Sequence, residues 1–238
     1  MKEESSKENE INYKNLLPHD PKTTIDILDN ISGVNYNVNF KIIVIGNSGV
    51  GKSSLILKGT QGIFKKDFIP TIGLNWLRFH VKINDKLIKL QIWYTCGQEQ
   101  YRSLITNFYR NTALALICYS ANDRKSFEEA DIWLKQVKMY SDPNCKVFLI
   151  ANKIDLPDRV VSSEEGIKYK KENGFECFIE TSAKSGFNAK ELFVNCALSL
   201  YKEYPKYKAG KEFLEAENEN KKVNLKRDVK NEENDCSC

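Results

Sequence analysis

The feature of the sequence that most constrains the fold is a short apolar run leading directly into a glycine-rich loop. Residues 40–45 read FKIIVI, and residues 46–53 continue as GNSGVGKS, which fits the pattern G-x-x-x-x-G-K-[ST]. The β-branched run predicts a strand, and residues 52–58 predict a helix after the loop. Glycines let backbone N–H groups curl around an anion, and a helix N-terminus adds partial positive charge. The segment therefore predicts a phosphate-binding loop in which Lys52 reaches the outer phosphates and the Ser53 hydroxyl ligates Mg²⁺.

Strand and helix patterns alternate through the middle of the chain. Short apolar runs follow at residues 74–83, 86–93, 113–119, 146–151 and 177–180, and amphipathic stretches at residues 126–140, 163–172 and 190–204. This alternation predicts an α/β domain of three layers, with a mostly parallel six-stranded sheet and helices on both faces. One pair differs, because Asn84-Asp85 between two of the runs is a hairpin signal. We therefore expect one antiparallel edge hairpin.

The two ends of the chain differ from the middle in composition. Residues 1–38 carry four Lys against seven Asp and Glu, and residues 205–238 carry eight basic and eight acidic residues. Both segments are polar and predict arms without stable structure, apart from a weak helical pattern at residues 23–30. The domain at residues 39–204 then carries about +7, from +4 + 3 − 0. A basic face suits a phosphate ligand or anionic lipid, although a mixed solvated surface explains the same charge.

Composition excludes several classes of protein. No stretch of eighteen apolar residues predicts a transmembrane helix, and the N-terminus lacks the apolar region of a secretory signal. The seven cysteines are odd in number and scattered, which indicates free thiols in a reducing compartment. A net charge of +4 is too small to indicate a nucleic-acid partner.

Two further segments follow strands at the edge of the sheet where open α/β folds bind ligands. Residues 152–155 read NKID after the strand at 146–151, and residues 181–184 read TSAK after the strand at 177–180. The Asp155 carboxylate can accept two hydrogen bonds from N1–H and the amine of guanine, whereas adenine offers no such pair. Each tetrapeptide alone also fits an ordinary turn. Together with the phosphate loop, they favour a guanine nucleotide as the ligand.

The order of these segments resembles a small GTPase of the Ras superfamily. The segments are the phosphate loop, TIG at 71–73, WYTCGQE at 93–99, NKID at 152–155 and SAK at 182–184. Details similar to the Rab branch are GNSGVGKSS at 46–54, LQIW at 90–93 and YRSL at 101–104. The resemblance covers residues 39–204 and leaves out residues 1–38. It implies the P-loop GTPase fold, with GTP or GDP and Mg²⁺ bound.

The resemblance assigns roles to individual residues. The implied nucleotide-binding residues are Ser48, Gly49, Val50, Gly51, Lys52, Ser53, Ser54, Phe64, Thr71, Gly97, Asn152, Lys153, Asp155, Ser182, Ala183 and Lys184. Phe64 would pack over the guanine ring, although it also suits ordinary hydrophobic anchoring. Thr71 would join Ser53 as a Mg²⁺ ligand when the γ-phosphate is present. Gly97 would donate its N–H to that phosphate, and Gln98 would orient the attacking water.

The resemblance also implies partners and a location. Trp76, Trp93 and Tyr109 would form an aromatic surface that meets effectors, although plain sheet packing explains them equally well. Cys236 and Cys238 at the C-terminus are similar to a Rab tail that carries two prenyl groups, and incidental exposed cysteines are the alternative. An exchange factor, a GTPase-activating protein and a GDP-dissociation inhibitor are implied as partners. The protein would cycle between cytosol and the cytoplasmic face of intracellular membranes.

One position departs from the family pattern. The family writes WDTAGQE where this chain has WYTCGQE, so that Tyr94 replaces an aspartate that holds a Mg²⁺-bound water. Loss of such a partner weakens metal binding about 10–100-fold. Two functions therefore stay open, a switch in vesicle traffic that hydrolyses GTP slowly and a nucleotide-bound platform with little GTPase activity. Residues 152–155 argue against a third, an ATP-using P-loop kinase.

Overall fold

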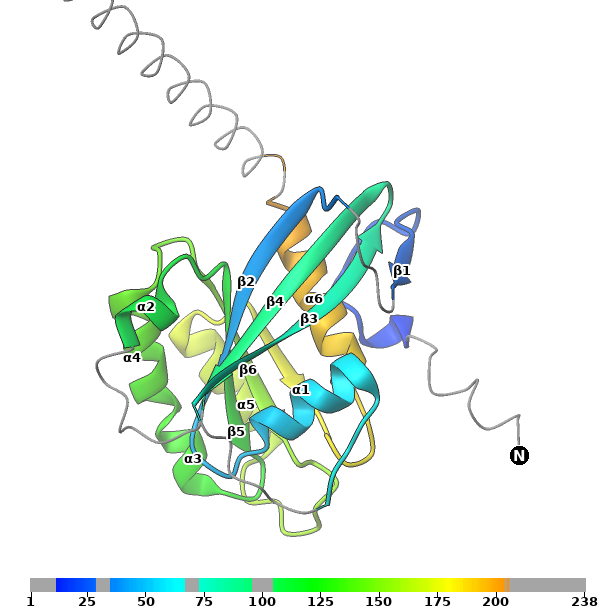
Figure 1. Cartoon of the computed structure of the whole chain (residues 1–238). Helices are drawn as coiled ribbons and strands as arrows, with labels where there is room; N and C mark the ends of the chain where they lie inside the picture. The colour runs from blue at the N-terminus through cyan, green and yellow to red at the C-terminus, as the bar shows by residue number, and fades with distance from the viewer. Residues whose placement is uncertain (1–11, 29–34, 67–72, 96–104, 204, 206–238) are drawn as a thin grey trace, which may run out of the picture. The chain divides into compact units, whose positions relative to one another are not determined.

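The computed structural model describes residues 12–28, 35–66, 73–95, 105–203 and 205 (Figure 1). Its single sheet has the strand order β1-β3-β4-β2-β5-β6-β7. The strands are β1 (Ile25–Ile27), β2 (Val38–Ile45), β3 (Leu74–Ile83), β4 (Lys86–Thr95), β5 (Leu114–Ser120), β6 (Lys146–Asn152) and β7 (Cys177–Glu180). Strands β4, β2, β5, β6 and β7 run parallel, whereas β1 and β4 each pair antiparallel with β3. The predicted α/β class and mostly parallel sheet are confirmed.

Helices lie on both faces of the sheet. They are the short 3₁₀ helix η2 (Tyr13–Asn15), α1 (Lys52–Gln61), α2 (Ile105–Tyr109), α3 (Arg124–Glu128), α4 (Ala130–Tyr140), α5 (Ser163–Asn173) and α6 (Ala189–Tyr201). In Figure 1, α1 and α6 lie on one side of β5, and α2 and α4 lie on the other. The sequence predicted one helix at residues 126–140 and none at 105–109. Within the described residues, no helix is both long and apolar enough to cross a membrane.

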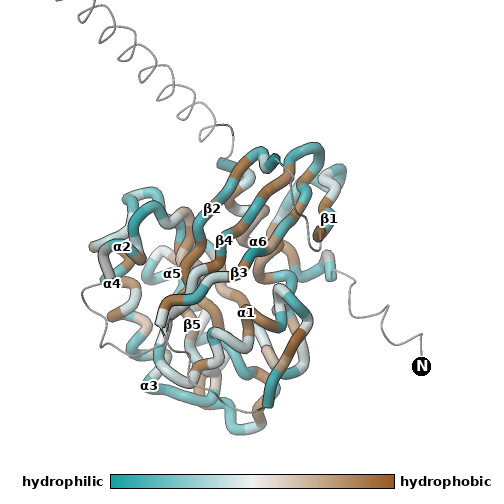
Figure 2. The backbone as a smooth tube through the Cα atoms, in the orientation of Figure 1, coloured by the Kyte–Doolittle hydropathy of each residue, from teal (hydrophilic) through white to brown (hydrophobic). Residues whose placement is uncertain are grey.

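The central strands are buried on both faces, which explains their unbroken apolar sequence. Every residue of β5 is buried, and five consecutive residues of β6 are buried too. Figure 2 shows this as hydrophobic colour along the strands in the middle of the fold. On the α4 side, the core includes Ile43, Ile117 and Leu149 from strands and Leu134 from the helix. The apolar sequence of these strands is unbroken because helices cover both faces of a parallel sheet.

The antiparallel hairpin forms where the sequence predicted it. Residues of β3 and β4 pair from Leu74 with Thr95 through Ile83 with Lys86, so the connection is the two residues Asn84 and Asp85. Asn84 has a φ of 54°, which is the left-handed conformation that such tight turns require and asparagine tolerates.

The start of α5 is fixed by a reciprocal cap and an ion pair. Ser162 Oγ accepts from the N–H of Glu165, and the Glu165 carboxylate accepts from the N–H of Ser162. Both oxygens of Glu165 also accept from the Arg124 guanidinium, at 2.6 and 3.2 Å. These bonds, the one from Arg124 first, hold the pKa of Glu165 at about 2.

Residues 12–28 contradict the prediction of an unstructured arm over residues 1–38. Strand β1 pairs with the edge of β3, with Ile25 opposite Ile83, and so makes the sheet seven-stranded rather than six-stranded. The weak helical pattern at residues 23–30 is also wrong, since Ile25–Ile27 is extended. Ile25 is buried, and its burial together with backbone pairing offsets the ordering of a short polar segment.

The same segment is fastened to α6 by a stripe of polar side chains. Glu191 Oε1 accepts from Asn12 N–H at 3.0 Å, and Asn188 Oδ1 accepts from Asn15 Nδ2 at 2.7 Å. Asn195 Oδ1 accepts from Leu17 N–H at 2.6 Å, while Asn195 Nδ2 donates to Asn15 C=O at 3.0 Å. Glu191 and Asn195 are consequently buried. Residues 12–17, which we name the N-terminal strap, therefore belong to the folded domain.

Candidate nucleotide-binding site

The phosphate loop lies between the end of β2 and the start of α1, as predicted. Gly46 has a φ of 138°, and a Cβ atom there would lie 2.1 Å from the carbonyl oxygen of Cys118 on β5. Only glycine therefore lets the chain turn beside the sheet at this point. Lys52 Nζ donates to the carbonyls of Gly46 and Asn47, at 2.7 Å each. These bonds fix a buried positive charge at the loop.

Asn152 joins the phosphate loop to the loops after β6 and β7. Its Nδ2 donates to Val50 C=O at 2.9 Å, and its Oδ1 accepts from Thr181 Oγ1 at 3.2 Å and from Ala183 N–H at 3.3 Å. The side chain is 1% exposed. A Cβ on Gly51 would lie 2.5 Å from Asn152 Nδ2, so glycine is required for this approach. The three loops therefore form one connected unit.

The predicted base-binding residues lie in that unit. Ser182 Oγ donates to Asp155 Oδ1 at 2.6 Å and accepts from Ser185 N–H at 3.0 Å. Ser182 is buried, whereas Asp155 is exposed to solvent. Lys153, in the loop after β6, has a φ of 64°. The carboxylate is thus oriented by a buried hydroxyl and is accessible to a ligand.

Some of the remaining predicted residues lie within the described part of the chain, and the others lie outside it. Ser48, Gly49 and Lys184 are exposed, Val50 and Ala183 are buried, and Ser53, Ser54 and Phe64 are half-buried. Thr71, Gly97, Gln98, Cys236 and Cys238 lie outside the described residues.

The site fits a nucleoside phosphate with Mg²⁺. The loop offers a fixed cation and the first turn of a ten-residue helix to a phosphate group, and Ser53 in that turn carries a hydroxyl suited to a hard cation. The loop that carries Asp155 offers acceptor oxygens to a base. No other chemistry is needed to explain this combination of donors and acceptors.

Comparison with known proteins decides the family. The Ras family model matches residues 41–202. The chain is 36% identical over 197 residues to Ras-related protein RABA1b of Arabidopsis thaliana, covering 82% of this chain and 91% of that relative. It is 42% identical over 163 residues to Ras-related protein Rab-3A of Homo sapiens, covering 68% of this chain and 74% of that relative. The chain belongs to the Rab family of small GTPases. In this Rab-family GTPase, the structure describes two further features that the sequence singled out, Tyr94 and the aromatic residues.

The first feature is Tyr94, close to the phosphate loop. Tyr94 pairs with Val44 of β2, two residues before Gly46, and is half-buried. Burial raises the pKa of the Tyr94 phenol, so the side chain is uncharged at neutral pH. Position 94, beside the phosphate loop, is therefore occupied by a neutral side chain.

The second feature is the predicted aromatic surface. Trp76 and Trp93 stack with ring centroids 6.0 Å apart, and Lys41 Nζ lies 5.6 Å from the Trp93 ring and 6.0 Å from the Phe108 ring. Tyr109 is only 2% exposed, and its hydroxyl donates to Gln136 Oε1. The prediction that Tyr109 joins the tryptophans is wrong, because this ring faces α4. Phe108 is the aromatic residue that shares Lys41 with Trp93.

Sequence reasoning missed the role of Asn47. Trp133 Nε1 donates to Asn47 Oδ1 at 2.9 Å, and Asn47 Nδ2 donates to Glu129. The phosphate loop of this Rab-family GTPase is therefore tied to α4 and its N-cap. The phosphate-loop motif allows any residue at position 47, so the motif alone does not indicate this contact.

Proposed function

We propose that this Rab-family GTPase is a guanine-nucleotide switch that hydrolyses GTP slowly and regulates vesicle and membrane trafficking. The observation that carries the proposal is the Asn152 hub, which connects the phosphate loop to both base-binding loops. A ligand that contacts both ends of this unit must carry phosphate and a base together. The uncovered Asp155 carboxylate favours guanine as the base.

The proposed contacts follow the structure from one end of the ligand to the other. The N–H groups of residues 48–54 and the Lys52 ammonium bind the phosphates. Asp155 accepts from guanine, while Lys153, Ser182, Ala183 and Lys184 frame the base and Phe64 packs over it. Ser53 and Thr71 would hold Mg²⁺, which would neutralise phosphate charge when bound.

Hydrolysis depends on residues outside the described part of the chain. Gly97 would donate its N–H to the γ-phosphate, and Gln98 would orient the attacking water. Phosphoryl transfer needs mainly positioning and charge stabilisation, and Gln98 would contribute the positioning of the attacking water. The order of motifs in the sequence supports these roles for Gly97 and Gln98.

A nucleotide-bound platform with little or no GTPase activity is the second candidate, and Tyr94 favours it. A half-buried neutral phenol cannot replace the charge of an aspartate near the metal. Under this alternative, the protein binds GTP and GDP but cycles slowly between them. Its partners would recognise a nearly constant shape.

Competition binding tests the choice of base. Displacement of labelled GDP by GTP, with ATP ineffective, supports the guanine assignment. Replacing Asp155→Asn puts a donor amide opposite the donors of guanine and should weaken GDP and GTP alike by several kcal/mol, roughly as loss of charge-assisted pairing does. If ATP competes as well as GTP, the assignment fails.

Single-turnover hydrolysis and nucleotide release separate the two candidates. Tyr94→Asp should slow GDP release about 10–100-fold at millimolar Mg²⁺ and should raise hydrolysis. Tyr94→Phe is the matched control, since it keeps the ring without adding charge, and should behave like the parent. Slower release with hydrolysis still negligible would place the catalytic defect elsewhere. No change in either rate would show that position 94 does not act through the metal.

We further propose that Cys236 and Cys238 carry two prenyl groups that hold the protein at the cytoplasmic face of intracellular membranes. Two lipid chains are enough for stable anchoring without a polybasic tail. An exchange factor, a GTPase-activating protein, a GDP-dissociation inhibitor and effectors are the partners that such a cycle requires. The relatives, named as Ras-related Rab proteins, support this assignment at the level of the family.

A further inference from the structure

Asn188 closes the loop that follows β7. We name residues 181–187, part of which is proposed to frame the base, the second base loop. Asn188 Nδ2 donates to Glu180 C=O at 2.8 Å, so that one side chain joins the residue after the loop to the residue before it. Asn188 has a φ of 54°, a left-handed conformation that asparagine tolerates. This hydrogen bond therefore spans the whole of the second base loop.

Backbone bonds give the second base loop its compact shape. Gly186 N–H donates to Ser182 C=O at 2.8 Å, and Ser182 N–H donates to Phe187 C=O at 3.0 Å. The Ser182 hydroxyl also donates to Asp155. These bonds lie within the two base loops, whereas the bond from Asn188 joins the ends of the second base loop where it meets β7 and α6. The placement of the loop on the domain therefore depends on Asn188.

The N-terminal strap orients the Asn188 side chain. Asn15 Nδ2 donates to Asn188 Oδ1 at 2.7 Å. Because the oxygen of the Asn188 amide accepts from Asn15, its nitrogen is left to donate to Glu180. The bond from the strap thus sets the amide orientation that closes the second base loop. In Figure 1, the 3₁₀ helix η2 of the strap lies beside the beginning of α6.

Asn15 is itself held by its backbone groups. Its N–H donates to Asn12 C=O at 2.9 Å within the strap, and its C=O accepts from Asn195 Nδ2 at 3.0 Å. Asn195 is buried on α6 and also accepts from the N–H of Leu17. The Asn15 side chain is therefore presented to Asn188 by a backbone that α6 fixes in place.

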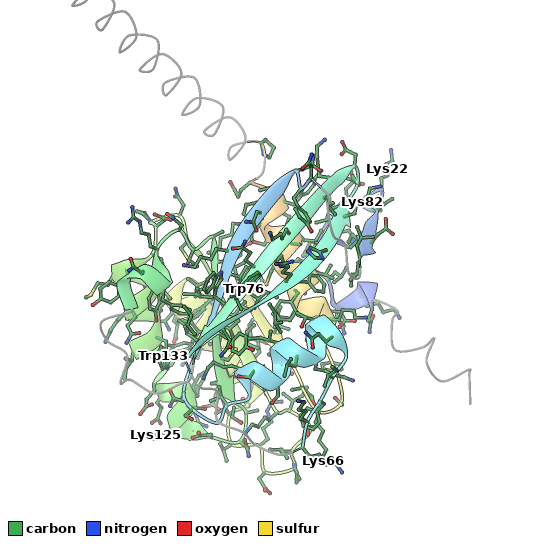
Figure 3. The ribbon with its side chains drawn as sticks, viewed as in Figure 1. Lys22, Lys66, Trp76, Lys82, Lys125 and Trp133 are labelled. Atoms are coloured by element: carbon green, nitrogen blue, oxygen red, sulfur yellow. The ribbon has the colours of Figure 1, made fainter. Side chains whose placement is uncertain are left out.

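Strand β1 keeps the strap attached to the domain at its other end. Thr24 N–H, just before β1, donates to Asn84 Oδ1 in the hairpin turn at 3.1 Å. Lys22 lies at the same end of the sheet as Lys82 (Figure 3). Because the strap is linked to a paired strand, its binding to α6 is intramolecular and is favoured by a high effective concentration.

We propose that Asn15 is a positioning residue for the second base loop, and that the docked strap slows the release of guanine nucleotide. Asn15 acts through Asn188 and does not touch the nucleotide. Release requires the loop around the base to open, and opening is less favourable while the strap holds Asn188. The inference rests on the proposed function and deepens it. It gives a regulatory role to residues 12–17, which lie outside the match to the Ras family at residues 41–202.

Release of a fluorescent GDP analogue from the full chain tests the proposal. Asn15→Ala removes the bond to Asn188 and should speed release about fivefold, the factor expected for loss of one hydrogen bond. Asn15→Asp keeps the size of the side chain but supplies no donor, so it should speed release to a similar extent. Asn12→Ala is the matched control, since Asn12 Oδ1 accepts from Lys14 N–H within the strap, and should release GDP at the parent's rate.

A double-mutant cycle separates positioning from a general loss of stability. Asn188→Gly removes the amide and permits the positive φ at this position. If Asn15 acts through Asn188, adding Asn15→Ala to Asn188→Gly should change release by less than about twofold. A full effect of Asn15→Ala in the Asn188→Gly background would overturn the proposal, because the strap would then act by another route. Release by Asn15→Ala at the parent's rate would overturn it as well.

Hydrogen–deuterium exchange follows the loop without a ligand. Amide exchange in residues 182–188 should rise in Asn15→Ala and Asn15→Asp and should stay at the parent's level in Asn12→Ala. Raised exchange in protein that binds no guanine nucleotide would refute the proposed function and retain the positioning role of Asn15. Normal GDP binding with unchanged exchange would refute the positioning role alone, whether or not release is faster.

Discussion

Replacing Asn152→Ala should weaken the order of the whole nucleotide site. We propose that the Asn152 side chain acts by holding the loops of the site together. The change removes hydrogen bonds to Val50, Thr181 and Ala183 from a side chain that is 1% exposed. At about 1 kcal/mol for each bond, the free energy of unfolding should fall by about 2–3 kcal/mol. For a domain of this size, the melting temperature should fall by roughly 4–12 °C.

Nucleotide affinity should fall by a similar free energy, because the ligand must then order loops that Asn152 orders in the parent protein. A loss of about 2–3 kcal/mol corresponds to about 30- to 150-fold weaker binding. GDP and GTP should be affected alike, since the bonds lie at the phosphate loop and base loops and not at the γ-phosphate. Release of a fluorescent GDP analogue and urea unfolding measure the two effects separately.

Two variants sharpen the test. Thr181→Val removes one donor to Asn152 and should show about a third of the effect, about 1 kcal/mol. Asn173→Ala, the matched control, removes one 3.0 Å bond to Tyr169 C=O on α5 and should leave nucleotide release unchanged. Normal nucleotide release by Asn152→Ala would refute the reasoning, because the loops would then be held in place independently of this side chain.

Three further predictions test the strap, an ion pair and the anchor. Asn195→Ala should lower the free energy of unfolding by about 2 kcal/mol, because two backbone groups of the strap lose their partner, and should speed proteolysis there; unchanged proteolysis would contradict the strap. The pKa of Glu165, about 2 against an ordinary 4.5, means that its stabilisation is complete above pH 4.5 and is lost as the pH falls toward 2. Glu165→Gln should therefore reduce the dependence of the melting temperature on pH between these two values, whereas Glu128→Gln should leave that dependence unchanged. A double Cys236→Ser/Cys238→Ser variant should leave the membrane fraction of cells, and equal membrane fractions of variant and parent would reject prenylation as the anchor.

Much of the fold was predictable because its determinants are local. The phosphate loop, the hairpin turn and the apolar strands each depend on residue type within a few positions. A buried parallel strand such as β5 reads as an unbroken apolar run, and a tight turn requires residues such as Asn84 that tolerate a positive φ. The places of Asp155 and Tyr94 in their motifs could likewise be recognised from the sequence alone.

The aromatic residue that joins Trp93 from α2 does not follow from local sequence. Phe108 and Tyr109 are adjacent on α2, and successive residues of a helix point about 100° apart. Sequence spacing within a short helix does not say which ring turns toward Trp93. Packing against α4 decided it, by burying Tyr109 and giving its hydroxyl a partner in Gln136.

The sequence by itself determined the family, the order of the strands along the chain and the chemistry available at each loop. Tertiary structure alone decided that residues 12–28 belong to the domain, and that the phosphate loop and base loops share Asn152. The strap has only six residues, so it is too short to show an apolar period that would mark it as ordered. Its order comes from α6, where Glu191 and Asn195 supply bonds to backbone groups more than 170 positions earlier in the chain. Pairings over that separation leave no pattern in either segment alone, because each half of the contact is an ordinary polar residue until the fold brings the two together.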